Sequence, residues 1–200
     1  MKAKDHSTNA FTLIELLAVI AVIAILSGIL IPVTGGVIKQ SKIAASKAQL
    51  RQYVTAIESF KAEYNYFPTI FGNSTASDSS YNIESAANSI NFIQTLSAKA
   101  VSDGKNIQAG GNQKGIGFHD FSSIECFVDA NGDVQTFRLA DRFNNTSINI
   151  RVDSDADGYI TPDVTPSRDP VAPSRALRAV ATAWVVAKPD GSEPGYGLWE

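Results

Sequence analysis

The amino-acid sequence predicts an α+β protein in which one long N-terminal helix packs on a small antiparallel β-sheet. Three observations support this prediction. An apolar run begins at residue 11, an amphipathic helical pattern follows it directly, and strand patterns take over from residue 116. Helices that precede a series of antiparallel strands are typical of the α+β class. The length of 200 residues suits one domain plus an anchor.

The apolar run, Phe11–Ile31, is predicted to be a transmembrane helix, because about 21 residues at 1.5 Å each span the roughly 30 Å core of a bilayer. A signal peptide is the alternative, but its apolar part covers only about 7–15 residues. The run holds one charged residue, Glu15, which makes Glu15 a candidate functional residue. No Lys, Arg or His lies in the run, so its partner is another chain, a terminal amine or water. Alternatively, Glu15 stays hydrated at the membrane interface.

The segment from Ala10 to Leu17, AFTLIELL, resembles the processing site of type IV prepilins and type II secretion pseudopilins, most closely the major pseudopilin. The resemblance implies that a prepilin peptidase cuts between Ala10 and Phe11 and that the new amine of Phe11 is methylated. It also implies that Glu15 pairs with this amine on a neighbouring subunit and that Pro32 bends the helix. Proline chemistry alone predicts that Pro32 ends or bends the helix. The family usually has Gly before the cut, and Ala10 keeps a small residue there.

The resemblance divides the chain into four segments: a leader peptide at 1–10, a transmembrane helix at 11–31, an amphipathic helical stem at 32–66 and a globular pilin-like head at 67–200. It implies a single pass through the inner membrane, with the leader in the cytoplasm and the head in the periplasm or outside. Charge alone leaves the orientation open, because basic residues flank the apolar run on both sides.

The stem is predicted to be helical from Val37 to about Tyr64, with an apolar stripe that docks on the sheet. The stripe consists of Ile43, Leu50, Val54, Ile57, Phe60 and Tyr64. A free coiled coil is the alternative, but the pattern has fewer than about four clean heptads. The segment KAEYNYFP at 61–68 resembles the end-of-helix signature of the family, with Asn65 in place of its Gly. Asn also accepts the left-handed conformation that ends a helix.

Charge is distributed unevenly between stem and head. Residues 33–64 carry five basic and two acidic side chains, a net charge of +3, whereas residues 65–200 carry ten basic and sixteen acidic, a net charge of −6. This asymmetry favours packing of the stem of one subunit near the head of another. Basic patches interleaved with aromatic residues are absent from the sequence, which argues against nucleic-acid binding.

The head is predicted to contain a polar loop at 72–82, a helix at 83–101 and a glycine-rich loop at 103–117. The glycine-rich loop lacks a Gly-Lys-Ser/Thr step, so it is not expected to bind nucleotides. Four strands follow, at 118–128, 134–139, 147–152 and 177–187, the last of them central. Between the second and third strands, Asp141-Arg142-Phe143-Asn144-Asn145 loosely resembles a turn of the family.

The segment Asp153–Ile160, DSDADGYI, follows the start of a calcium-binding loop, with carboxylates at positions 1, 3 and 5 and Gly at position 6. Position 12 is Val164 instead of Glu, so Asp163 or a residue from another loop has to substitute for the missing ligand. The predicted calcium ligands are Asp153, Asp155, Asp157, the carbonyl of Tyr159 and Asp163. The alternative is a solvated acidic turn. Major pseudopilins carry calcium nearer the C-terminus, where residues 188–195 of this chain have only two acidic groups.

The sequence indicates a structural protein and not an enzyme. His119 is the only histidine after the predicted cut, and the spacings of hydrolase and metalloprotease motifs are absent from the sequence. Cys126 is the only cysteine and is expected to be a buried apolar residue. The resemblance implies a subunit of a type II secretion pseudopilus. Its partners would be further copies of the chain, other pseudopilins, prepilin peptidase and an inner-membrane assembly platform. The alternatives are a type IV pilus or competence pilin, or a monomeric membrane-anchored surface domain that binds calcium.

Overall fold

The structure is a computed structural model that describes residues 12–72, 74–164 and 170–199, without the side chains of residues 29–34. The predicted processing residues, Ala10 and Phe11, lie outside the described residues. Contacts divide the chain into two units, one that ends at Ser41 and one that covers residues 42–200.

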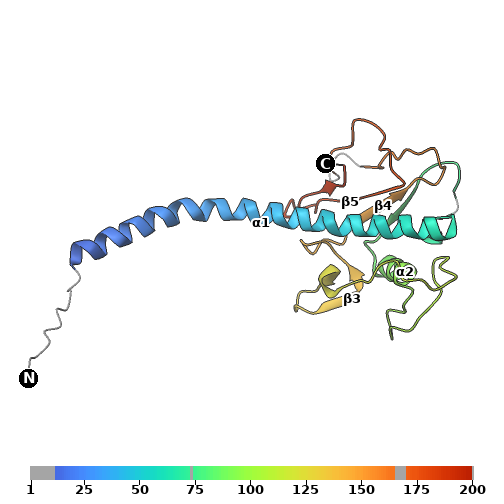
Figure 1. The fold of residues 1–200 in the computed structure, drawn as a ribbon, viewed down its shortest axis with the longest axis horizontal. Helices are drawn as coiled ribbons and strands as arrows, with labels where there is room; N and C mark the ends of the chain where they lie inside the picture. Colours follow the sequence, from blue (N-terminus) through green and yellow to red (C-terminus); the bar gives the residue numbers. More distant parts are fainter. Residues whose placement is uncertain (1–11, 73, 165–169, 200) are drawn as a thin grey trace, which may run out of the picture. The chain divides into compact units, whose positions relative to one another are not determined.

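The first unit contains the N-terminal part of α1, a helix that covers Leu13–Tyr64 (Figure 1). We expected Pro32 to end or bend this helix. The helix continues through position 32, so Pro32 does not end it, and the side chain of Pro32 lies outside the described residues. The large apolar side chains from Leu13 to Leu26 are 51–81% exposed. This surface of α1 is therefore left uncovered by the rest of its own unit.

The second unit is built on a four-stranded antiparallel sheet with the strand order β1-β4-β5-β6. The strands are β1 (Ser79–Asn82), β4 (Ile148–Val152), β5 (Ala181–Val185) and β6 (Tyr196–Gly197). All five residues of β5 are buried, which agrees with its predicted central place. The antiparallel sheet and the α+β class are thus confirmed.

A second layer consists of α2 (Ala86–Ser97) and a two-stranded hairpin of β2 (Cys126–Val128) and β3 (Val134–Leu139). Two short 3-10 helices, η1 (Thr69–Phe71) and η2 (Ser123–Glu125), complete the described elements. In Figure 1 the four-stranded sheet lies on one side of the C-terminal part of α1, and α2 and β3 lie on the other.

The core forms where the C-terminal part of α1 meets both layers. The predicted stripe is confirmed at Leu50, Ile57 and Phe60, which are at most 1% exposed, and Tyr53 joins them. Their partners in the same cluster include Ile148, Ile150 and Ala183 of the sheet and Phe92 and Leu96 of α2. Each such side chain contributes about 1.5–3 kcal/mol through burial, so this helix face holds the two layers together. Asn65 ends α1 at φ 61°, the left-handed conformation that we predicted.

Four predicted segments differ from the structure by several residues. The predicted strand at 118–128 is wrong over most of its length, because only Cys126–Val128 is a strand. The predicted loop at 72–82 contains β1, whose polar sequence SSYN hides the strand. The predicted helix at 83–101 is shorter: Ser85 caps its start, and Ala98, at φ 55°, ends it. The strand expected at 177–187 is limited to Ala181–Val185.

Candidate functional site

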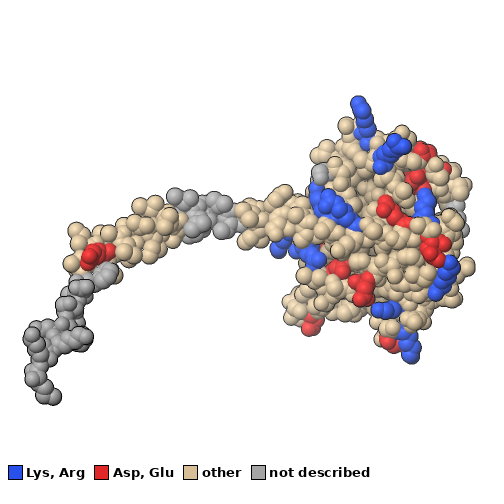
Figure 2. Space-filling model, viewed as in Figure 1, with Lys and Arg blue, Asp and Glu red and all other residues tan. Residues whose placement is uncertain are grey.

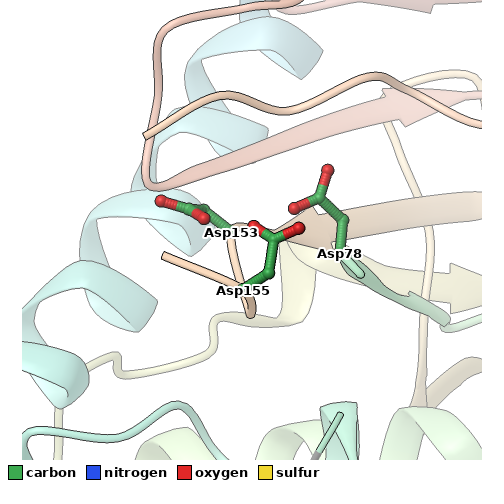
Figure 3. Close-up of side chains that lie close together, drawn as sticks. All are labelled: Asp78, Asp153 and Asp155. Carbon is green, nitrogen blue, oxygen red and sulfur yellow. The ribbon is translucent and has the colours of Figure 1, made fainter. Parts of the chain in front are cut away.

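Three carboxylates from two segments meet at one end of the β1–β4 pair. Asp78 directly precedes β1, and Asp153 directly follows β4. The register opposes Ser79 to Val152, so the next position of the antiparallel ladder sets Asp78 against Asp153. One carboxylate oxygen from each of Asp78, Asp153 and Asp155 lies within 4.8 Å of the other two. Figure 3 shows these three side chains close together at the strand ends.

Two of these carboxylates are buried and incompletely paired. Asp153 is 4% exposed, and the side chain of Asp78 is 9% exposed. The Oδ1 atoms of both are buried without a hydrogen-bond partner among the described residues. A buried acceptor without a donor costs about 1–3 kcal/mol, and more when it is charged. The cluster is therefore short of positive or donor groups.

The partners that the cluster does have are distant. Oδ2 of Asp78 lies 3.5 Å from Nε of Arg151 and accepts from the Thr161 N–H at 3.4 Å. Burial raises the pKa of Asp78, the Thr161 N–H and Arg151 act to lower it, and the nearby carboxylate of Asp155 adds to the rise. Oδ2 of Asp153 accepts from the Gly158 N–H at 3.2 Å. One guanidinium thus faces three carboxylates, a local charge of about −2.

The loop after β4 has the sharp turn that we predicted, with Gly158 at φ 83°. The structure brings together two of the predicted ligands, Asp153 and Asp155. It adds Asp78, which sequence reasoning missed. Asp157, Tyr159 and Asp163 lie outside this group of three. Oδ1 of Asp157 instead accepts from the Tyr159 N–H at 2.7 Å, an Asx turn that shapes the loop.

A hollow of about 310 Å³ adjoins the cluster on the side of α1. Asp153 and Ser154 line it from the loop, and Lys61 and Asn65 line it from the end of α1. Nζ of Lys61 lies 4.2 Å from the centre of the Phe67 ring. The hollow thus lies directly beside Asp153, although Asp153 itself is buried.

At the N-terminus, Glu15 closes a capping box with Thr12. Oε2 of Glu15 accepts from the Thr12 N–H at 2.9 Å and from the Thr12 hydroxyl at 2.7 Å, while the Glu15 N–H donates to Oγ1 of Thr12 at 3.3 Å. Such reciprocal bonds satisfy the free N–H groups at a helix start. Sequence reasoning missed this partner within the chain. The carboxylate is consequently held beside the backbone nitrogen one residue after Phe11.

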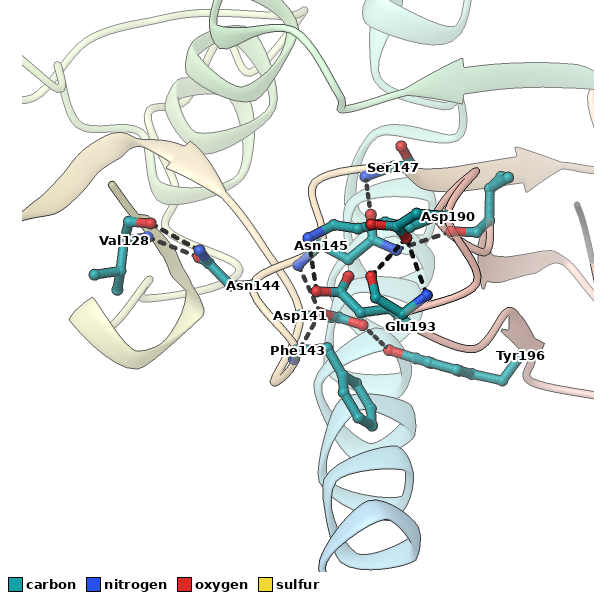
Figure 4. Close-up of polar contacts among 12 residues, drawn as sticks. Val128, Asp141, Phe143, Asn144, Asn145, Ser147, Asp190, Glu193 and Tyr196 are labelled. Atoms are coloured by element: carbon teal, nitrogen blue, oxygen red, sulfur yellow. Dashed lines mark hydrogen bonds and ion pairs between the residues drawn. The ribbon is translucent and has the colours of Figure 1, made fainter. Parts of the chain in front are cut away.

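The Asp141–Asn145 turn fastens the β3–β4 connection to the C-terminal strand (Figure 4). Oδ1 of Asp141 accepts from the N–H groups of Phe143 and Asn145 at 2.8 and 2.9 Å, and Oδ2 accepts from the hydroxyl of Tyr196. Asn144 exchanges two hydrogen bonds of 2.7 Å with Val128. Burial raises the pKa of Asp141. The pKa of Tyr196 is raised by its own burial and by the negative charge of the neighbouring Asp141 carboxylate. These contacts give the turn an architectural role.

His119 pairs with the buried carboxylate of Glu125. Its Nε2 lies 2.9 Å from Oε2 of Glu125, and the Ser122 N–H and hydroxyl donate to Oε1 of Glu125 at 3.1 and 2.9 Å. Burial acts to raise the pKa of Glu125, but the bonds from His119 and Ser122 hold it below its usual value. Cys126 is 8% exposed, as predicted. Burial raises the pKa of its thiol, which lowers its reactivity.

Comparison with known families finds a match at the N-terminus. Residues 6–31 match the prokaryotic N-terminal methylation motif, so the chain carries a prepilin-type segment for cleavage and methylation. The motif covers Ala10, Phe11 and Glu15, and it implies processing by a prepilin peptidase, a membrane-anchored N-terminal segment and pilus-like polymerisation. Neither a curated protein nor a solved structure matches the chain. In the described part of the chain, no helix combines the length and the apolar character that a bilayer crossing requires.

Proposed function

We propose that the chain is a structural subunit of a type II secretion pseudopilus and not an enzyme. Prepilin peptidase removes residues 1–10, and Phe11–Ile31 anchors the subunit in the inner membrane with its head in the periplasm or outside. Assembly into a helical filament then buries the apolar surface of the first unit against other copies. The observation that carries this proposal is the methylation motif at residues 6–31, with Glu15 as the one charge in the apolar run.

Glu15 is the residue on which assembly depends in this proposal. Its carboxylate pairs with the methylated amine of Phe11 on a neighbouring subunit, because a charge in a bilayer needs a partner. The hydrogen bonds from Thr12 support this role, since they orient the carboxylate at the start of α1. The exposed apolar side chains from Leu13 to Leu26 support burial between subunits, where helices associate by close packing.

The first test is the chemical state of the N-terminus in the native host. Mass spectrometry of the membrane fraction should find a chain that begins with N-methylated Phe11. A chain that keeps Met1 would contradict the proposal and favour a monomeric anchored domain.

The second test is assembly. Glu15→Gln should reduce the sheared-filament fraction at least about tenfold, because an amide cannot form the ion pair. Glu58→Gln, an exposed carboxylate on the same helix, is the matched control and should assemble normally. Normal assembly of the Glu15→Gln subunit would refute the pairing role.

A third test, deletion of the gene, separates a secretion pseudopilus from a type IV pilus. Loss of exported proteins from the medium supports secretion, whereas loss of surface fibres alone supports a type IV pilus or competence pilin.

A further inference from the structure

We propose that Asp78, Asp153 and Asp155 form a calcium site that ties the start of β1 to the loop after β4. The site goes beyond the filament function and does not depend on it. It differs from a calcium loop made of consecutive residues, because one ligand, Asp78, precedes β1 and lies more than 70 positions away from the other two in the sequence.

The first argument is burial without compensation. The Oδ1 atoms of Asp78 and Asp153 are buried and unpaired among the residues described, and Figure 3 shows the Asp78 carboxylate next to that of Asp155. Like charges this close repel one another strongly in a partly buried site. The Arg151 guanidinium, at 3.5 Å, compensates only one of them. A divalent cation would neutralise the remaining charge of about −2 and give the unpaired oxygens a partner.

The second argument is the donor chemistry. The cluster offers carboxylate oxygens, without sulfur or imidazole among its three residues. Oxygen ligands select hard cations. Calcium takes six to eight oxygens in flexible geometry, whereas magnesium demands a near-ideal octahedron. An irregular loop that faces a strand end therefore fits calcium better than magnesium. Water from the adjoining hollow would complete the coordination of the ion.

The test uses the full-length chain purified in detergent, stripped with EDTA and titrated calorimetrically with calcium alone. The wild type should bind one calcium ion, with a Kd of about 10⁻⁴–10⁻³ M, the range of extracellular calcium modules. At calcium tenfold above Kd, the melting temperature should rise by about 3–6 °C. The proposal would be overturned if calcium gave no heat of binding and left the melting temperature unchanged. It would also be overturned if magnesium bound with the same Kd and raised the melting temperature equally.

Two isosteric variants distinguish the proposed ligands from a loop-only site. Asp78→Asn should weaken calcium binding about tenfold or more, because it removes a charged ligand. Asp157→Asn, in the same loop but outside the cluster, keeps the acceptor of its Asx turn and should bind within about twofold of wild type. The opposite pattern would overturn the proposal in favour of a consecutive loop.

Stability without calcium provides the folding control. In EDTA, Asp78→Asn should melt at the same temperature as the wild type or higher, since it removes one of three repelling charges. If Asp78→Asn fails to fold, Asp155→Asn tests the same site from the loop after β4. Unchanged calcium binding in Asp155→Asn would then refute the proposed ligand set.

Discussion

Replacing Asn112 with Ala should destabilise the head by about 3–5 kcal/mol, although Asn112 lies in a glycine-rich loop. Asn112 is 1% exposed, and its side chain makes four hydrogen bonds. Oδ1 accepts from the Tyr64 hydroxyl at 2.6 Å and from the Ile116 N–H at 3.0 Å. Nδ2 donates to the carbonyl oxygens of Thr95 and Ile116 at 3.0 and 2.7 Å. One amide thus joins the loop to α1 and α2.

The magnitude follows from the partners that the substitution leaves behind. A neutral hydrogen bond contributes about 1 kcal/mol net, and each buried group left unpaired costs about 1–3 kcal/mol. The Tyr64 hydroxyl retains one contact, because it also accepts from the Lys114 N–H at 3.0 Å. At about 1–1.5 kcal/mol for each full loss, the lower part of that range, three full losses and one partial loss give about 3–5 kcal/mol.

The assay is urea unfolding of the full-length chain in detergent, followed by the fluorescence of Trp184 and Trp199. The free energy of unfolding falls with urea concentration by about 2 kcal/mol/M, so the urea midpoint of unfolding should be about 1.5–2.5 M lower for Asn112→Ala than for the wild type. Asn106→Ala, an exposed residue of the same loop, is the control and should stay within about 0.5 kcal/mol of wild type. An equally small effect of Asn112→Ala would refute the idea that this side chain organises the loop.

Two further predictions concern buried carboxylates of the head. Tyr196→Phe removes the hydroxyl that donates to Asp141, and it should cost about 1.5–3 kcal/mol in urea unfolding, the range for a hydrogen bond to a charged group. The pKa of Glu125 is held below its usual value of 4.5 in the folded protein. Above pH 4.5 the ionised carboxylate therefore stabilises the fold. This contribution to the free energy of unfolding is lost as the pH falls through the pKa of the folded state. The stability difference between wild type and Glu125→Gln should therefore shrink between pH 6 and pH 3, and a constant difference would contradict this assignment.

The fold was predictable where the pattern is long and local. The α1 stripe, the left-handed Asn65 and the buried β5 all follow from helical periodicity, from backbone preference and from a continuous apolar run. The strand predicted at 118–128 was wrong because Phe118 and Phe121 pack as single aromatic side chains against the core, outside any strand. Apolar residues in short runs do not distinguish these two situations.

The residues of the candidate sites were likewise predictable only where they lie close together in the sequence. The methylation motif is a run of adjacent residues, so sequence alone identified it. Asp153 and Asp155 were likewise found from their spacing. Asp78 could not be found, because its place depends on the pairing of β1 with β4, and the polar sequence of β1 gives no alternation that would predict this pairing. Side chains that act through long-range contacts, such as Asn112, were hidden for the same reason.

Strand register connects the proposed calcium site to the stability of the sheet edge. β1 is four residues long and pairs only with β4 in the four-stranded sheet described, and apolar patterning specifies its register weakly. A slip of one residue would move Asp78 away from Asp153, so the register builds the site. Without a cation, repulsion between the carboxylates opposes this register. Bound calcium would reverse that balance and hold β1 in place, because ligand binding and the structure that creates the site stabilise each other.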